Sequence, residues 1–378
     1  MPRATDVRVK GTALYYLPVQ TRVPLKFGPE TLSSVTCARV ELTVADAAGR
    51  TAAGWGETPL SVQWVWPSSL SYSERHEALK EFTELLAKRW ADYPARGHPM
   101  ELGRDFQRDV LTAELQSFNE ARGGSEHMPW LAALVCCSLF DLALHDAYGV
   151  LHGVDVYTTY NGDFMSRDLA DFLVDSDGSK AVFEGKYPAD YLVADRPSSL
   201  SAWHLVGGKD LLDAAELDGS EPDDGYPVLL ADWIERDGLT CLKVKLRGDD
   251  AAWDYDRLVS VGQLALEGSC PWLTTDFNCT VEDPQYVNEI LDRLKADHEN
   301  IFDMILYVEQ PFPYDLERYS IDVHSVSERK PLFMDESAHD WEVVARGREL
   351  GWTGVALKTC KTQTGALLSL CWAKQHGM

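Results

Sequence analysis

The feature that most constrains the fold is a rhythm of short apolar strands and helix-like stretches in the second half of the chain. The strands are expected at residues 241–246, 272–276, 304–309, 332–335 and 354–358, and the helices around 254–266, 284–295 and 341–350. Strands that alternate with helices form parallel sheets with right-handed crossovers. A barrel or an open doubly wound sheet fits this pattern. The sequence has no G-x-G-x-x-G or P-loop motif, which removes the commonest reasons to prefer the open sheet.

The first half of the chain predicts a small α+β domain. Residues 35–44 are rich in β-branched side chains, a turn follows, and residues 51–57 form a return strand in which Gly54 and Gly56 allow close backbone packing. Ser71 and Glu74 fit a capping box at the start of a helix. Further helices are expected from about 104 to 120 and from Pro129, at a first helical turn, to about 148.

The stretch from 161 to 227 is rich in Asp, Gly, Ser and Pro and has only short apolar runs. It predicts a long irregular connection that ends with one strand, and a connection of this length is often functional or disordered. The chain therefore divides into an α+β domain at 1–160, the connection at 161–227 and a second domain at 228–378.

Composition excludes several classes of partner. The net charge of −25 argues against nucleic acid and anionic membranes. Eight cysteines without disulfide-like or zinc-like spacing indicate reduced, buried thiols. The N-terminus lacks the apolar core of a signal peptide, and the most apolar stretch, 130–144, contains Asp141 and is too short to span a bilayer. We expect a soluble protein of the cytoplasm.

Charged residues recur at or near the ends of the predicted strands. They are Lys243, Asp276, Glu309, Asp335 and Lys358, at intervals of 33, 33, 26 and 23 residues, together with Lys245, two residues after Lys243. Each interval is about the length of one strand–helix unit, and catalytic groups of (β/α) barrels lie at the carboxyl ends of the strands. The sequence therefore predicts that these residues converge in one site.

Three converging carboxylates need a positive charge to neutralise them, and Mg²⁺ prefers carboxylate oxygens. Lys243 and Lys245 share one face of their strand, and Leu242, Val244 and Leu246 share the other, so the lysines are expected to point inward. Burial beside a metal lowers the pKa of a lysine, as a general base near neutral pH requires.

Each residue also has a simpler interpretation when it is taken alone. Two lysines on one strand face are often solvated, and a carboxylate after a strand often ends a turn or caps a helix. Lys361 competes with Lys358 for its place in the series. The order and spacing of the whole series favour a shared site.

The sequence resembles the mandelate racemase and muconate lactonizing branch of the enolase superfamily. The matching stretches are Leu242-Lys-Val-Lys-Leu246, Thr275-Asp-Phe-Asn278, Val308-Glu-Gln-Pro311, Met334-Asp-Glu-Ser337 and Ala356-Leu-Lys358. In the first domain, Gly54-Trp55-Gly56-Glu57 and Leu139-Phe-Asp-Leu142 resemble the capping domain of that family. The resemblance covers most of the chain.

The resemblance implies an enolase-type (β/α) barrel with an N-terminal α+β capping domain and a small carboxylate as substrate. It makes Asp276, Glu309 and Asp335 the Mg²⁺ ligands, Lys245 the base on one face of the substrate and Lys358 the acid or base on the other. Lys243 would help to hold the substrate carboxylate or the enolate. Asn278, Gln310 and Glu336 would contact the substrate or support the ligands. By analogy, a homo-oligomer is expected.

Two features depart from the family. The connection before Lys243 is longer than the family has there. In the loops of the cap, residues 24–29 and 62–67, with Trp64 and Trp66, are the candidates for contacts that set specificity; these aromatics equally fit a role in packing the cap. Only six strands are counted from Leu200 onward, whereas a closed barrel has eight, so the sequence predicts a barrel truncated after its sixth unit.

Three functions are consistent with these features. The first is a racemase, epimerase or cycloisomerase that abstracts an α-proton through an enediolate. The second is a sugar-acid dehydratase, which needs an acid for the departing hydroxyl group. The third is a non-catalytic homologue that acts as a binding or scaffold protein.

Overall fold

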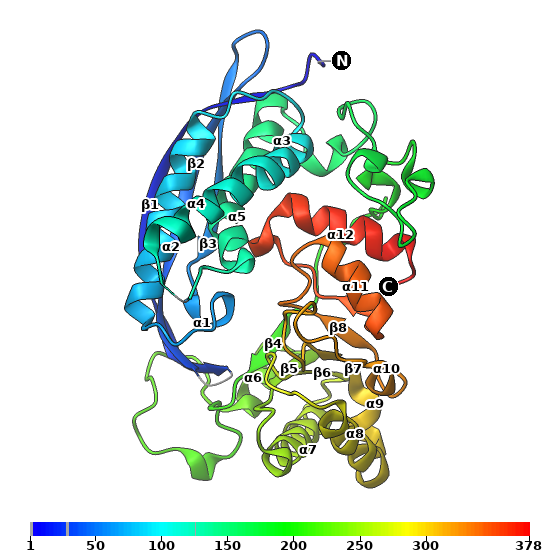
Figure 1. Ribbon diagram of the computed structural model, residues 1–378. Helices are drawn as coiled ribbons and strands as arrows, with labels where there is room; N and C mark the ends of the chain where they lie inside the picture. Colours follow the sequence, from blue (N-terminus) through cyan, green and yellow to red (C-terminus); the bar gives the residue numbers. More distant parts are fainter. Residues whose placement is uncertain (1–2, 28–29, 125) are drawn as a thin grey trace.

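The N-terminal part of the protein is an antiparallel sheet covered on one face by helices. The computed structural model describes residues 3–27, 30–124 and 126–378. The sheet has the order β1-β2-β3, from β1 (Arg8–Phe27), β2 (Glu30–Ala45) and β3 (Thr51–Pro59) (Figure 1). Its helical elements are α1 (Val62–Val65), α2 (Tyr72–Ala91), α3 (Pro99–Asp105), the π-helical η1 (Phe106–Leu111), α4 (Thr112–Arg122) and α5 (Trp130–His152). The antiparallel strands followed by helices agree with the α+β arrangement predicted for this part, which is called the capping domain below.

Local sequence signals placed most of these elements. Ser71 and Glu74 form the predicted capping box at the start of α2. The helix expected from 104 to 120 begins earlier, at Pro99, and passes through η1 before α4. Pro129 is the N-cap of α5 rather than a residue of its first turn.

Helix α5 is the central helix of the capping domain. It extends over 23 residues, and by length and composition it could cross a membrane, so the expectation that this stretch is too short was wrong. However, 83% of its most apolar window is buried inside the protein. It is therefore the core helix of this domain.

Helix α5 lies directly against the backbone of β3. A Cβ atom at Gly54 would lie 2.1 Å from Ala147 N, and one at Gly56 would lie 1.9 Å from Leu139 O. The close packing predicted for this strand is therefore real, because only a residue without a side chain fits at either position.

The connection between the two parts is held by short turns rather than by long helices. Its elements are η2 (Val156–Thr159), η3 (Leu169–Asp171), η4 (Ala181–Phe183), η5 (Pro188–Asp190), β4 (Trp203–Val206) and η6 (Ala214–Glu216). Asp155, Asp168 and Asp213 each accept a hydrogen bond from a backbone N–H two residues on. The expected irregular segment with one strand is thus observed, while the domain limits at 160 and 227 stay a prediction.

The second part is a parallel sheet of six strands in the order β4-β5-β6-β7-β8-β9. The strands after β4 are β5 (Cys241–Lys245), β6 (Trp272–Asp276), β7 (Ile305–Glu309), β8 (Leu332–Met334) and β9 (Gly354–Val355). The helical elements are α6 (Leu230–Asp237), α7 (Ala251–Glu267), α8 (Pro284–Asp297), α9 (Glu299–Met304), α10 (His324–Ser327), α11 (Trp341–Leu350), η7 (Thr359–Lys361) and α12 (Gln363–Gln375).

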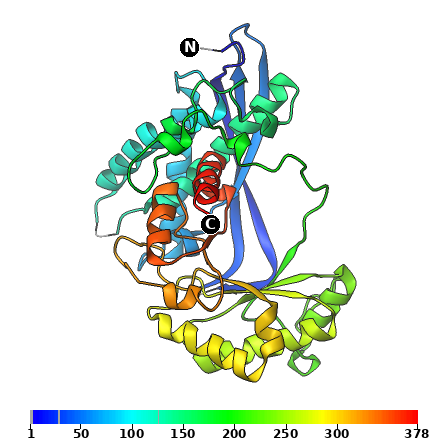
Figure 2. The ribbon, with the colours of Figure 1, turned by 90° about the vertical axis from the view of Figure 1, so that its right-hand side faces the viewer.

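Side chains of this sheet alternate between two faces. Leu242 and Val244 are fully buried in the core that the strands share with helices such as α7 and α8 (Figure 2). The predicted alternation of strand and helix is therefore confirmed, although β8 ends before Asp335 and β9 ends before Lys358, so the predicted strands 332–335 and 354–358 were too long. Among the described strands, β4 and β9 lie at the two edges. Closure into a barrel and truncation after the sixth unit stay predictions.

The close contact of α5 with β3 makes a prediction about stability. In Gly56→Ala the new methyl group would meet the Leu139 carbonyl, so the helix must move. We expect a loss of about 1–3 kcal/mol in the free energy of unfolding, measured by urea denaturation. Gly11→Ala in β1, where no atom lies within 4 Å of the added Cβ, is the matched control and should change stability little. Equal stability of the two variants would contradict this packing.

Candidate active site

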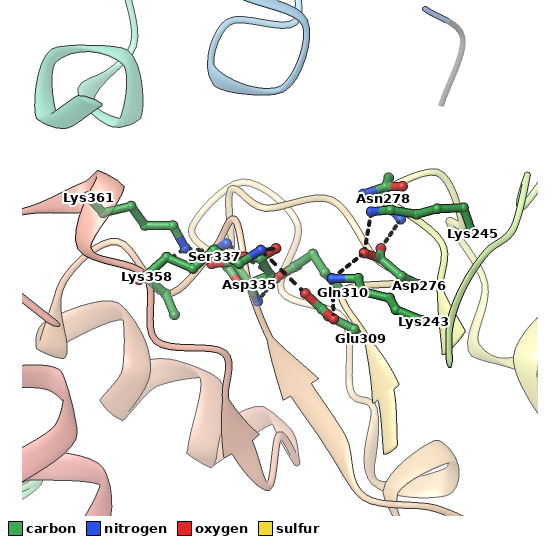
Figure 3. Close-up of polar contacts among 11 residues, drawn as sticks. Lys243, Lys245, Asp276, Asn278, Glu309, Gln310, Asp335, Ser337, Lys358 and Lys361 are labelled. Atoms are coloured by element: carbon green, nitrogen blue, oxygen red, sulfur yellow. Dashed lines mark hydrogen bonds and ion pairs between the residues drawn. The ribbon is translucent and has the colours of Figure 1, made fainter. Parts of the chain in front are cut away.

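Parallel pairing brings four of the six predicted charged residues together at the carboxyl ends of neighbouring strands. Lys243 and Lys245 project from β5, Asp276 ends β6 and Glu309 ends β7. Lys245 pairs in register with Asp276, and Asp276 pairs with Glu309. The three strands therefore place these side chains side by side (Figure 3).

Asp335 and Lys358 reach the same place from loops after β8 and β9. Gln310 holds the first of these loops: its side-chain oxygen accepts hydrogen bonds from Asp335 N at 2.7 Å and from Ser337 Oγ at 2.7 Å. Gln310 is fully buried. The loop after β8 is thus fixed by the residue that follows Glu309, and all six predicted residues lie together.

The lysines and carboxylates form a buried ionic cluster. Lys243 Nζ lies 2.9 Å from Asp276 Oδ2 and 2.6 Å from Glu309 Oε2. Lys245 Nζ lies 2.5 Å from Asp276 Oδ2, and Lys358 pairs with Asp335 and lies 3.5 Å from Glu309 Oε1. Buried charges are tolerated when each has such a partner.

The pKa values of the carboxylates differ because the lysine ammonium groups offset the effect of burial at some of them and not at others. Burial alone would raise the pKa of Asp276, but the ammonium groups of Lys245 and Lys243 outweigh it and hold it below its ordinary value. Burial together with the charge of Asp276 raises the pKa of Glu309 to about 7, although Lys243 opposes the shift. Glu309 is therefore the least compensated carboxylate of the cluster.

Lys243 does not show the expected decrease in pKa. Burial lowers its pKa, but the neighbouring charges of Asp276 and Glu309 outweigh burial and leave it above the ordinary value. The expectation considered burial and a metal, and it left out the direct pairing with two carboxylates. A lowered pKa would require another cation to take up the charge of those carboxylates.

Lys358 and Lys361 have different positions in the site. The side chain of Lys361 is 3% exposed, and its Nζ contacts Asp335 Oδ1 at 3.2 Å as well as the Asp335 carbonyl oxygen. The side chain of Lys358 is 38% exposed and lines a cavity beside the cluster. Spacing alone did not separate the two lysines, whereas the family resemblance favoured Lys358, and Lys358 is the one that lines the cavity.

The three residues that follow the carboxylates, Asn278, Gln310 and Glu336, have different surroundings. Asn278 lines the cavity, and its backbone N–H donates to Asp276 Oδ1 at 2.9 Å. Glu336 is buried, and burial with the charge of Asp335 raises its pKa. The side chain of Gln310 holds the loop after β8 by accepting a hydrogen bond from Asp335 N, and it does not line the cavity.

The cluster fits a divalent cation such as Mg²⁺. One oxygen each of Asp276, Glu309 and Asp335 lies within 4.8 Å of the others, and all three residues are buried. Glu309 Oε1 is buried and accepts no hydrogen bond from the described residues, which leaves it available to a cation. Hard carboxylate oxygens are the donors that Mg²⁺ prefers.

A cavity of about 160 Å³ opens beside the cluster. Its charged and polar walls are Lys245, Asn278, Asp335, Glu336 and Lys358, and its apolar walls are Leu25, Trp64 and Leu205. Leu25 and Trp64 lie in the two segments expected to set specificity. Trp66 instead is buried in the capping core, and residues 28 and 29 of the first segment lie outside the described residues.

Three larger cavities lie elsewhere. One, of about 770 Å³, lies between α3, α5 and α11, and another, of about 730 Å³, lies between the end of β1 and residues 204–233. The third, of about 320 Å³, is lined by Arg39, Trp55, Gly56 and Glu57. None of the three contains the carboxylate cluster. The smaller cavity is the candidate site, because chemistry rather than volume identifies it.

Sequence reasoning missed two contributors. Leu205 was hidden in the irregular connection, although its position in β4, paired with Lys243, turns it toward the site. The hydroxyl group of Ser337 completes the hydrogen bonds of Gln310. Ser337 lies within the matching stretch 334–337 and Leu205 within the connection, but only the strand register and the loop contacts show their roles.

Comparisons with known proteins bear on the fold of this chain. No family model matches the sequence, and no curated protein is similar to it. Solved structures match nearly its full length. A dipeptide epimerase from Cytophaga hutchinsonii, complexed with Mg and D-Ala-L-Val, is 17% identical, with a TM-score of 0.60 over 98% of this chain and 78% of that one.

Two further structures belong to the same group. A mandelate racemase/muconate lactonizing protein from Herpetosiphon aurantiacus is 18% identical, with a TM-score of 0.59 over 100% of this chain and 81% of that one. A muconate lactonizing enzyme from Pseudomonas fluorescens, complexed with muconolactone, is 15% identical, with a TM-score of 0.58 over 98% and 78% of the two chains. The resemblance to the mandelate racemase and muconate lactonizing branch of the enolase superfamily is thus confirmed at the level of the fold, and this chain has the fold of that family.

Proposed function

We propose that the protein is a Mg²⁺-dependent isomerase that removes and returns the α-proton of a carboxylate substrate through an enediolate. Racemisation, epimerisation and cycloisomerisation are the net reactions consistent with this step. One observation carries the proposal: Lys245 and Lys358 lie on opposite sides of a buried carboxylate triad (Figure 3). Two proton-transfer groups that face each other across a substrate suit a change of configuration.

In this proposal Asp276, Glu309 and Asp335 hold Mg²⁺. When bound, the ion supplies positive charge that stabilises the substrate carboxylate as charge develops on it. The ion pairs of the cluster already balance carboxylates against lysines. A divalent cation therefore leaves an excess of positive charge, which an anionic substrate offsets.

The lysines would share the proton transfers. Lys245 takes the α-proton from one face of the substrate, and Lys358 returns a proton to the other face or works in the reverse direction. Lys243, between Asp276 and Glu309, holds the substrate carboxylate as negative charge builds up on it. Leu25, Trp64 and Leu205 cover the cavity and exclude water from the reacting carbon.

The fold neighbours suggest where to look for the substrate. One was solved with a dipeptide and another with muconolactone, so the search begins with dipeptides and with unsaturated dicarboxylates. We also propose that the protein works in the cytoplasm, on a small molecule rather than on nucleic acid or a membrane surface, and as a homo-oligomer. The net charge of −25 supports the exclusion of polyanionic partners.

The first prediction concerns metal binding. Mg²⁺ added to the chelator-treated protein should bind at one site in a calorimetric titration and raise the melting temperature. Asp276→Asn should abolish this binding, because the neutral amide replaces a charged oxygen ligand. The exposed Asp256→Asn on α7 is the matched control and should bind as the wild type does.

Absence of binding in a wild-type chain that melts cooperatively would refute the metal site. Equal binding by Asp276→Asn and wild type would place the ion elsewhere.

The second prediction concerns proton transfer. The test uses a panel of dipeptides and unsaturated dicarboxylates, called the carboxylate panel. In deuterated water with Mg²⁺, the protein should exchange the α-proton of at least one member, and mass spectrometry detects the exchange. Lys245→Ala should slow the exchange by about 10²–10⁴-fold, the range for loss of a general base. Lys88→Ala, on the exposed surface of α2, should have no effect. Full turnover in Lys245→Ala would exclude Lys245 as the base.

The product of the same assay separates the alternatives. Deuterium at an inverted α-carbon supports racemisation or epimerisation, and a keto acid instead identifies a sugar-acid dehydratase. A protein that binds Mg²⁺ and exchanges no proton of any carboxylate in the panel fits a binding or scaffold role.

A further inference from the structure

The segment Leu139-Phe-Asp-Leu142 has no part in the proton transfers. Within it, Asp141 is the most deeply buried acidic residue of α5. Asp141 is fully buried in a helix whose neighbouring positions are apolar. Among the described residues it forms no ion pair with a lysine or arginine. The ring of His145 is 3.9 Å away, and burial lowers the pKa of that histidine. A buried carboxylate requires hydrogen-bond donors for its oxygens.

Its partners lie at the beginning of α12. Asp141 Oδ2 accepts a hydrogen bond from Thr364 N, and Asp141 Oδ1 accepts one from Thr364 Oγ1, both at 2.8 Å. Thr364 is the second residue of α12, where backbone N–H groups have no acceptor within the helix. The capping domain therefore supplies a carboxyl group that accepts hydrogen bonds at the N-terminus of α12.

The contact is shaped so that only these residues fit. A Cβ atom at Gly103 of α3 would lie 2.3 Å from Asp141 Oδ1 and 2.4 Å from Thr364 Oγ1. His145 Nε2 lies 3.0 Å from Thr364 Oγ1 on another side. Thr364 is thus enclosed by α3 and α5.

A single residue, Thr362, separates α12 from the turn that carries Lys358 and Lys361. Thr362 has φ of 82°, a conformation that costs a β-branched residue energy. Its Oγ1 accepts hydrogen bonds from Gln107 Nε2 at 3.1 Å and from Gly365 N at 3.0 Å. Only Thr362 and Gln363 lie between Lys361 and Thr364. A shift of Thr364 is therefore transmitted to the turn at residues 358–361.

We infer that Asp141 is a positioning residue, which sets the location of residues 358–361 by anchoring Thr364 to the capping domain. The turn places Lys361 on Asp335 and Lys358 on the cavity. This inference rests on the proposed function only where it assigns a proton-transfer role to Lys358. The positioning itself can be measured without metal or substrate.

Cys360, within this turn and partly exposed, reports its position. Iodoacetamide labelling of the native, metal-free chain, resolved by peptide mass spectrometry, gives a rate for each cysteine. In Asp141→Asn we expect Cys360 to react about tenfold faster, because an amide group cannot accept both hydrogen bonds and the turn opens more often. Cys37 on β2 should keep its rate, and Cys136 and Cys137, buried on α5, should stay protected.

Two further variants sharpen the test. Asp146→Asn changes an exposed carboxylate on the same helix, which accepts a hydrogen bond from Trp55 N at 2.8 Å and, among the described residues, none from α12; it should leave Cys360 at the wild-type rate. Thr364→Val removes the hydroxyl donor and keeps the backbone N–H, so it should give a smaller increase. This variant decides the question if Asp141→Asn fails to melt cooperatively.

An unchanged rate at Cys360 in both variants would overturn the inference. An equal increase at Cys37, Cys136 and Cys137 would also overturn it, because Asp141 would then stabilise the capping domain as a whole. The Mg²⁺ titration of the wild type fails or succeeds independently of these rates. Failure of the proposed function is therefore distinguishable from failure of the positioning role.

Discussion

The register of the parallel sheet is the constraint on which the rest of the structure depends. Lys245, Asp276 and Glu309 lie in one row across three strands, so each charge meets its partner inside the protein. An unpaired charge in this position would cost several kcal/mol. A slip of one residue in β5 would turn Leu242 and Val244 into the cluster and both lysines into the apolar core. The same alternation therefore specifies both the core and the site.

The capping domain completes the site by a second close contact. Helix α5 reaches the backbone of β3 because Gly54 and Gly56 leave room for it, and the same helix carries Asp141 to the start of α12. Trp64, which follows β3, covers the cavity from the cap. The packing of one helix thus connects the capping core with the loop that carries Lys358 (Figure 1).

The sequence predicted those elements whose side chains follow a period. The bounds of β6 and α11 agree with the alternation and helical spacing read from the residues. The ends of β8 and β9 were placed too late, because their backbones leave the sheet to meet Gln310 and the cap, contacts between residues distant in sequence. The order of the charged series was enough to predict the cluster. The choice between Lys358 and Lys361 was not, since both lie in or beside the same short turn and only tertiary contacts separate them.

Backbone strain is concentrated around the cluster. Five non-glycine residues in the described part of the chain have positive φ, and four of them follow strands or the turn at the site: Asn278, Cys279, Gln310 and Thr362. Each such conformation costs of order 1–3 kcal/mol and persists only where other contacts fix it. Gln310 is fixed by its hydrogen bonds to the loop after β8, and Thr362 is fixed by Gln107. Asp276 and Glu309 end their strands, and these loops hold Asp335 and Lys358 beside them without a ligand. The strained backbone at the carboxyl ends of the strands therefore accompanies a site whose residues are already in place.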